Sequence, residues 1–470
     1  MKKFISCVLF IVLLSLTIYR VYNVLSWKDT TGDYLSSTQQ LYATEEDLMD
    51  VIFVGSSHVY CGIYPEKLWG TYGIAGFNMS ISGQDKNSSY HTIKEVLKTQ
   101  SPKVVLVDMY GLMFDVHGVQ GNVYRNMLAM RTSQNSVELV KDYVAKEEQM
   151  DYILRWPIIH TRYKELDKYD FVQYEPSVYG RGNYVLWETI PVGKPTEAIE
   201  CDEIGELGET NEKWLNELYD LSVENDFELV FMVIPFAATK EDQMIINAAK
   251  AFADEREIDF LDFNKMGEQI YLDYAADFSD AFHLNVNGAN RITAYLGEYL
   301  SVNYGLIDNR GDERYWQWDD AFTYYEQLEK EYYLAQMQTI EDYVRFLDSM
   351  QHITCVVSLE GEYKESTLDI KGALSDMGIT EEEYEAGGTF LYKDGKVEKI
   401  LDADSTETVV HELNEYDAFK IQNEKLLNED ADNLSDIMLN LEPVGCVFNG
   451  ATFAVYDDFQ KKLINKKGFY

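Results

Sequence analysis

One serine near the start of the chain has the setting of a catalytic nucleophile. Ser57 stands in Gly55-Ser56-Ser57-His58, directly after the apolar residues 51–54. In open α/β sheets, ligands and catalytic groups lie just beyond the carboxyl ends of the strands, where this hydroxyl would be exposed. The structural alternative is that Ser56 and Ser57 cap the following helix, and the tetrapeptide alone favours that alternative.

A second motif, late in the same region, contains the other groups that an activated serine needs. Asp280 lies three positions before His283. A serine nucleophile needs a base to take its proton and a carboxylate to orient that base, and one loop can supply both. The alternative is a surface loop with helix-capping residues, which we favour less because the chain has only seven histidines. Ser57, Asp280 and His283 are therefore the predicted catalytic residues.

The elements that must position these residues alternate between short apolar runs and helical stretches. Five runs predict buried strands: residues 51–54, 76–79, 104–107, 229–234 and 258–261. Alternating β and α units imply a parallel sheet that is covered on both faces. Residues 115–210 interrupt the alternation, and we expect them to form an insertion over the active face.

The N-terminus has the layout of a membrane signal or anchor. Lys2 and Lys3 precede an uncharged run, and no small-residue cleavage site follows it. If Arg20 snorkels, residues 4–25 approach the ~20-residue span of a bilayer. We expect an uncleaved signal-anchor over residues 1–26, with the lysines cytoplasmic and the rest of the chain outside the cell membrane. The alternative is a buried helix of a soluble protein.

The composition excludes several classes of partner and site. The 470 residues include 81 acidic and 40 basic side chains, and 40 − 81 gives a net charge of −41 at pH 7. That charge repels DNA and RNA, so we expect no nucleic-acid partner. The five cysteines are scattered, without a C-x-x-C pair or clustering with histidine. We therefore expect free thiols, no metal site and no cofactor.

The rest of the chain predicts a tether, a linker and a second domain. Residues 27–48 are polar and acidic and lead into the α/β domain, which we place at 49–305. Residues 306–350 are acidic, aromatic and helical, as expected of a linker. Residues 351–470 hold short strand-like runs and an Asp394-Gly395 hairpin signal, which predict a smaller α+β accessory domain.

At the serine and Asp-x-x-His motifs the sequence resembles the SGNH/GDSL hydrolase superfamily. The resemblance covers about residues 48–303 and is greatest to membrane-anchored bacterial cell-envelope members, which include relatives that modify teichoic acids and exopolysaccharides. It implies a flavodoxin-like, three-layer α/β domain with Ser57 as nucleophile and Asp280 and His283 as its partners. Gly83 matches the glycine whose backbone N–H, with that of Ser57, holds the oxyanion.

One departure from the family pattern concerns the third oxyanion donor. The family places an Asn shortly after a strand, whereas here residues 104–107 lead into Asp108 and Tyr110, without an Asn. The oxyanion hole would then use two backbone donors, or borrow Asn78 or Tyr110. Losing one donor costs ~10²-fold or more in rate. His58, next to the nucleophile, is expected to pack structurally.

The resemblance and the three residues together imply acyl transfer outside the cell membrane. The expected activity is that of a serine esterase or O-acyltransferase on acyl esters, acetyl esters above all, of cell-envelope polysaccharide. Water as second acceptor gives the esterase and a sugar hydroxyl the transferase, and the residues leave both open. The resemblance also implies a membrane-bound O-acyltransferase as partner. The alternative is a non-catalytic polysaccharide-binding or assembly protein. Residues 351–470 are faintly similar to interleukin-like EMT-inducer domains.

Overall fold

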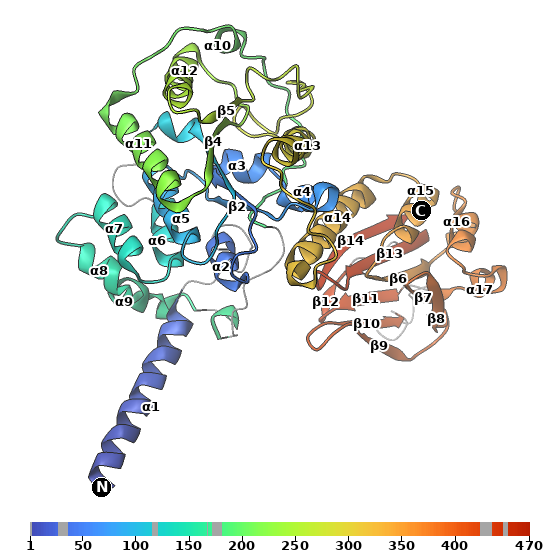
Figure 1. Ribbon diagram of the computed structural model, residues 1–470. Helices are drawn as coiled ribbons and strands as arrows, with labels where there is room; N and C mark the ends of the chain where they lie inside the picture. The colour runs from blue at the N-terminus through green and yellow to red at the C-terminus, as the bar shows by residue number, and fades with distance from the viewer. Residues whose placement is uncertain are drawn as a thin grey trace. The chain divides into compact units, whose positions relative to one another are not determined.

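Two compact units make up the chain, Met1–Phe322 and Thr323–Tyr470 (Figure 1). The computed structural model describes residues 2–26, 36–114, 121–166, 168–171, 181–423, 435–444 and 450–470. The first unit carries the predicted site residues and is a mixed α/β structure.

A five-stranded parallel sheet forms the centre of the first unit, as the sequence predicts. Its strands are β1 (Val51–Gly55), β2 (Gly76–Ser80), β3 (Val104–Asp108), β4 (Glu228–Val233) and β5 (Asp259–Asp262). They run in the order β2-β1-β3-β4-β5, and every neighbouring pair is parallel. In such a doubly wound sheet, ligands bind where the strand order reverses, which here is between the ends of β1 and β3.

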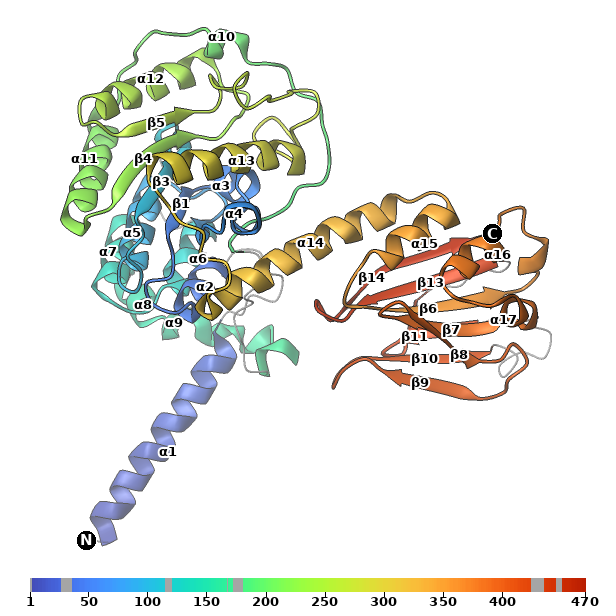
Figure 2. The same cartoon turned by 45° about the vertical axis from the view of Figure 1, so that its right-hand side comes forward.

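Helices cover both faces of this sheet (Figure 2). One face packs against α5 (Lys86–Val96), α11 (Gly208–Asn225) and α12 (Lys240–Asp254). The other packs against α3 (Ser57–Gly62), α4 (Pro65–Tyr72) and α13 (Val286–Asn303). Because strand side chains alternate, Ile52 joins the first apolar core and Phe53 the second. Every residue of β1, β2 and β3 is buried, which explains the apolar runs of β1 and β3.

The segment predicted as an insertion begins with a group of short helices. They are α6 (Gly121–Ala129), α7 (Gln134–Tyr143), α8 (Gln149–Leu154), α9 (Trp156–Ile159), η2 (His160–Lys164) and η3 (Lys168–Phe171). Helix α7 packs on α5, whereas η2 and η3 contact the end of α1 (Lys2–Leu25). Residues 184–192 are extended and lie beside the loop that carries His283, since Ile190 N–H donates to the Phe278 carbonyl oxygen at 2.9 Å.

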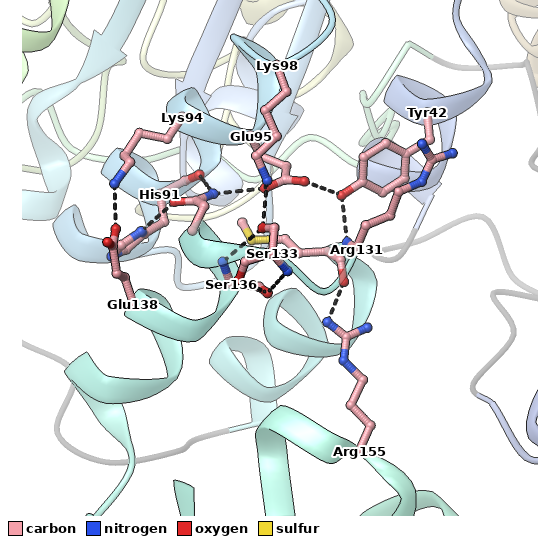
Figure 3. Close-up of polar contacts among 12 residues, drawn as sticks. Tyr42, His91, Lys94, Glu95, Lys98, Arg131, Ser133, Ser136, Glu138 and Arg155 are labelled. Carbon is pink, nitrogen blue, oxygen red and sulfur yellow. Dashed lines mark hydrogen bonds and ion pairs between the residues drawn. The ribbon is translucent and has the colours of Figure 1, made fainter. Parts of the chain in front are cut away.

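Polar side chains join α7 to α5 in what we call the α5–α7 cluster (Figure 3). His91 bonds Asn135 Oδ1 through Nδ1 at 2.7 Å and Asp142 Oδ2 through Nε2 at 2.9 Å. Buried Glu95 accepts hydrogen bonds from Asn135 Nδ2 at 2.8 Å and from Lys98 Nζ at 2.5 Å. These bonds fix the insertion to a helix that covers the sheet.

One helix of the first unit, α1, is long and apolar enough to cross a membrane. Its candidate span is Phe4–Leu25, 22 residues, and no residue in the 18-residue apolar window of this span is buried against the protein. This agrees with the membrane-directed N-terminus that the sequence predicts, by length and composition.

The second unit contains two antiparallel sheets. One has the order β14-β13-β6-β7-β8 and the other the order β12-β11-β10-β9. Strands of the first sheet are β6 (Ile353–Glu360), β7 (Gly388–Lys393), β8 (Lys396–Leu401), β13 (Gly450–Asp457) and β14 (Lys462–Phe469). Those of the second are β9 (Thr408–Glu412), β10 (Ala418–Asn423), β11 (Ser435–Leu439) and β12 (Glu442–Pro443). The hairpin predicted at Asp394-Gly395 joins β7 to β8, with both turn residues at positive φ.

The segment predicted as a helical linker is divided between the two units. Helix α14 (Trp316–Gln336) starts in the first unit, where Trp318 joins the apolar core against α5 and α11. Helix α15 (Ile340–Asp348) buries Tyr343 and Leu347 in the core of the second unit. Residues 323–350 therefore fold with the second unit, because the apolar face of α15 needs its sheet for burial. Helices α16 (Ile370–Asp376) and α17 (Glu381–Ala386) complete this unit.

Candidate active site

A tight turn between β1 and α3 presents Ser57. Ser56 is the residue that caps α3, since its Oγ accepts a hydrogen bond from His58 N–H at 3.4 Å. A Cβ atom at Gly55 would lie 2.6 Å from Val59 Cγ2 and 2.8 Å from Asp108 Cβ, so only glycine fits there without displacement. The capping alternative thus applies to Ser56, and the Ser57 hydroxyl has another partner.

That partner is His283, from the loop before α13. The Ser57 Oγ atom lies 2.8 Å from His283 Nε2. On the opposite side of the ring, Nδ1 lies 2.9 Å from Asp280 Oδ1 and 2.8 Å from Asp280 Oδ2. The structure therefore brings together the three predicted catalytic residues in the hydroxyl–imidazole–carboxylate arrangement that activates serine.

The loop that holds the imidazole is fixed by backbone hydrogen bonds. Asp280 Oδ1 accepts the N–H groups of Phe282 at 2.7 Å and His283 at 2.9 Å. The Ala281 carbonyl oxygen accepts Ala237 N–H at 2.8 Å, which ties the loop to the residues after β4. The loop geometry, and with it the direction of the ring, is set before any substrate arrives.

The electrostatics of the pair favour an ionised Asp280. Partial burial acts to raise the pKa of this carboxyl, but hydrogen bonds from the His283 ring and from two backbone N–H groups outweigh it, so the pKa lies below its usual value. The carboxylate is therefore charged at neutral pH and can stabilise an imidazolium on His283.

The His58 ring packs beside the His283 imidazole. Its ring is 2% exposed, stacks on Tyr110 with ring centroids 3.8 Å apart, and meets the His283 ring edge-on at 5.7 Å. Burial, together with the charge of His283, lowers the pKa of His58 to about 3, so the ring is neutral. The predicted packing role is observed, and Phe236, which the sequence analysis did not single out, packs against the same ring at 5.4 Å.

The predicted oxyanion donors differ in their surroundings. Gly83 lies in a turn that Gln84 N–H closes onto the Ile81 carbonyl oxygen at 3.1 Å, with φ at +63°, a conformation that favours glycine. Asn78, in contrast, is fully buried in β2, and its Nδ2 donates to the Ile63 carbonyl oxygen at 2.9 Å. Its side chain does not face a substrate, which leaves the backbone N–H groups of Ser57 and Gly83 as candidate donors.

Asp108 is the last residue of β3. It is buried, and its Oδ1 accepts Ile234 N–H at 3.4 Å, which joins the end of β3 to the end of β4. Burial raises the pKa of this carboxyl to about 7. The residue therefore joins two strand ends under the site.

Other candidate sites have little support in the described part of the chain. No group of three or more His, Cys, Asp or Glu residues there could hold a metal ion. The described cysteines, Cys7, Cys61, Cys201 and Cys355, are free thiols, and Cys446 lies outside the described residues.

Comparisons with known proteins find likenesses among solved structures. No protein-family model matches this chain, and no curated protein matches it. A solved structure from Bacteroides fragilis, described as a "putative acylhydrolase", is similar over 59% of this chain and 100% of its own, with 12% sequence identity and a TM-score of 0.28. A TM-score this low carries no argument, so the function has to be inferred from the site itself.

Proposed function

We propose that this protein transfers acyl groups from esters through Ser57. The observation that carries the proposal is the 2.8 Å contact between Ser57 Oγ and His283 Nε2, with Asp280 bonded to the other ring nitrogen. The two elements that hold these groups are 226 positions apart in the sequence, which argues against a chance local contact.

In the proposed reaction, His283 takes the proton of Ser57 while Oγ attacks the ester carbonyl carbon. The tetrahedral intermediate carries its negative charge on the former carbonyl oxygen, toward the backbone N–H groups of Ser57 and Gly83. The imidazolium then returns the proton to the leaving alcohol, which leaves an acyl-enzyme. Water or a sugar hydroxyl, deprotonated by His283, releases the acyl group and restores the serine.

We further propose that this chemistry takes place outside the cell membrane on acyl esters, acetyl esters above all, of envelope polysaccharide. Support comes from α1, which Lys2 and Lys3 would orient with its start in the cytoplasm, and from the resemblance to envelope members of the SGNH/GDSL superfamily. A membrane-bound O-acyltransferase as acyl donor belongs to the same proposal. The net charge of −41 disfavours strongly anionic polymers as free substrates.

A non-catalytic polysaccharide-binding protein is the second candidate function. The observation that favours it is Asp108, which stands where the family pattern has an oxyanion donor and is buried instead. The contact of Ser57 with His283 opposes it, because a binding protein has no need of an activated hydroxyl.

A covalent probe separates the two functions. The full chain in detergent is treated with a fluorophosphonate, and turnover of p-nitrophenyl acetate is measured in parallel. We expect labelling at Ser57 and turnover, both lost in Ser57→Ala. The matched control is Ser301→Ala, which removes a hydroxyl bonded to the Gly297 carbonyl oxygen within α13 and should change neither readout. Absence of labelling, or equal turnover by wild type and Ser57→Ala, would favour the binding protein.

A further inference from the structure

Exposed apolar side chains gather where α1 joins the folded part of the first unit. We call Met150, Leu154, Trp156, Tyr163 and Phe171 the interfacial cluster; they lie on α8, α9, η2 and η3 and are between 39% and 68% exposed. Both ribbon views show α8 and α9 beside the end of α1 (Figures 1 and 2). Concentrated apolar exposure of this kind marks interaction surfaces in soluble domains.

We propose that the interfacial cluster docks onto the lipid surface of the membrane that α1 crosses. The occupant is the boundary between phospholipid headgroups and acyl chains. The proposal goes beyond the acyl-transfer chemistry, and it rests on the membrane location proposed for α1.

The length of α1 and the position of Tyr22 on it place Trp156 near the edge of the hydrocarbon core. The 22 residues of Phe4–Leu25 rise by about 1.5 Å each, so the span is about 33 Å long, close to the ~30 Å of a hydrocarbon core. Tyr22, about 4.5 Å before the end of the span, must then lie at the edge of the hydrocarbon. The Trp156 ring stacks on Tyr22, with centroids 6.2 Å apart and planes at 16°. The depths of Trp156 and Tyr22 therefore differ by no more than the 6.2 Å between their ring centroids.

Side-chain hydrogen bonds attach η2 and η3 to the end of α1. Arg162, on η2, donates through Nη1 to the carbonyl oxygens of Leu25 at 3.0 Å and Ser26 at 2.7 Å, and through Nη2 to Asp170 Oδ1 at 2.8 Å. The terminal carbonyl groups of a helix lack hydrogen-bond donors within the helix. Here the buried guanidinium of Arg162 provides the donors. This clamp fixes η2 and η3 to the end of α1, so the cluster cannot move away from the membrane while α1 spans it.

The residue types of the interfacial cluster suit a membrane–water interface. Trp and Tyr are enriched at membrane–water interfaces, where the ring enters the acyl boundary and the polar atom stays wet. Trp156 and Tyr163 have this character, and Phe171 and Leu154 add purely apolar area. Exposed Lys164 can keep its ammonium among the headgroups while its stem lies along the boundary. The cluster thus has the chemistry of an interfacial belt that is supplied by the folded domain.

Tryptophan quenching tests the depth of Trp156. The full chain is reconstituted in phosphatidylcholine vesicles whose acyl chains carry bromine, and fluorescence quenching is compared for Trp156→Phe and Trp316→Phe. Trp316 is the matched control, since it is 51% exposed and lies at the start of α14. We expect Trp156→Phe to lower the quenched fraction of the fluorescence, whereas Trp316→Phe, which removes an unquenched emitter, should raise that fraction slightly. Equal quenched fractions in both variants would overturn the proposal.

Site-directed labels test the rest of the cluster. Nitroxides are placed by Tyr163→Cys and Phe171→Cys in a full chain that carries Cys7→Ser and Cys446→Ser. The control is Ile204→Cys, between α10 (Thr196–Ile199) and α11, a residue that is 65% exposed. We expect the two cluster labels to relax more with oxygen than with a water-soluble nickel complex, and the control label to do the reverse.

A flotation assay keeps failure of docking apart from failure of the anchor. If alkali-washed vesicles still carry the chain and both cluster labels are as accessible to water as the control, the cluster faces water and the lipid proposal is overturned. If the chain does not float, the membrane location proposed for α1 fails, and the lipid proposal fails with it. Neither result bears on Ser57 labelling, which is measured in detergent.

Discussion

Two clusters in the first unit are built around a histidine that contacts an aspartate, and they have different chemistry. In the candidate active site, His283 Nδ1 lies 2.8 Å from Asp280 Oδ2, and the His283 side chain is 25% exposed. In the α5–α7 cluster, His91 Nε2 lies 2.9 Å from Asp142 Oδ2, and the His91 side chain is 5% exposed. The carboxylate contact is nearly the same, so the difference must come from the other ring nitrogen.

The partner of that second nitrogen decides what each ring can do. Asn135 donates through Nδ2 to the His91 carbonyl oxygen and to Glu95, so its Oδ1 faces His91 as an acceptor. His91 thus has an amide oxygen on one side and a carboxylate oxygen on the other, and neither of these groups has a proton to give up. His283 Nε2 instead meets the Ser57 hydroxyl, which can give up a proton. His283 can act as a base because a hydroxyl lies at the ring nitrogen that does not contact its aspartate. At the same place His91 has an amide oxygen, which suits a structural role.

Replacing each histidine by glutamine gives the largest expected contrast. His283→Gln removes the base and should lower turnover of p-nitrophenyl acetate by about 10³-fold or more. His91→Gln should leave turnover unchanged, while the loss of one buried hydrogen bond costs about 1–3 kcal/mol and lowers the melting temperature. Comparable losses of turnover in the two variants would remove the distinction drawn between the rings.

Replacing each aspartate by asparagine tests the histidine–aspartate contact that the two clusters have in common. Asp280→Asn keeps the shape but removes the charge that stabilises the imidazolium, so we expect a loss of about 10²-fold or more in kcat. Asp142→Asn should affect only thermal stability, because no charge develops on His91 during a reaction. Stopped-flow kinetics and melting curves on the same samples measure both effects, and an unchanged kcat in Asp280→Asn would contradict the assigned role.

Gly83→Ala tests a feature that the active site alone requires. A side chain at φ +63° strains the turn by about 1 kcal/mol and shifts the backbone N–H that is proposed to hold the oxyanion. We expect kcat to fall by about 10-fold, with little change in KM, since the oxyanion forms only in the reaction. The control is Gly193→Ala, at a glycine where an added Cβ has open space. A fall in stability without a fall in kcat would exclude Gly83 as a donor.

The smallest expected effect concerns Asp108, whose pKa burial raises to about 7. Between about pH 4, the ordinary value, and about pH 7, the folded carboxyl keeps a proton that the unfolded chain releases. Its contribution to stability therefore falls as the pH rises through this window. Asp108→Asn cannot titrate, so its stability relative to wild type should increase from about pH 5 to about pH 8. Urea unfolding of both proteins at the two pH values measures this difference in the free energy of unfolding. A difference that does not change with pH would show that the pKa of Asp108 is not raised.

The sequence was most informative where local spacing carried the chemistry. A strand followed by Gly-Ser-Ser and a loop with Asp-x-x-His predicted which side chains would meet, because parallel strands end at one edge of the sheet. The catalytic role of those residues stays a proposal. Asn78 shows the limit of this reasoning, since its position in β2 predicted proximity to the site but not that its amide would point into the protein toward Ile63.

Features that depend on packing between distant helices could not be predicted. His91 and Asn135 are 44 positions apart and carry no motif, and they meet only because α7 lies on α5. The interfacial cluster was equally hidden, because Trp156 has a distinct role only once its ring is seen on Tyr22. The sequence also did not reveal that the linker predicted at 306–350 contributes Trp318 to the core of the first unit and Tyr343 to that of the second, because both depend on packing with distant residues.

The long separation of Ser57 from His283 has a consequence for biosynthesis. A chain that is made from its N-terminus contains β1 and the serine turn long before residue 283 has been added. Contacts of high sequence separation form late, after the intervening chain has been ordered. Until the loop before α13 is in place, the Ser57 hydroxyl has no imidazole beside it, so a nascent or truncated chain lacks the contact on which the proposed activity depends.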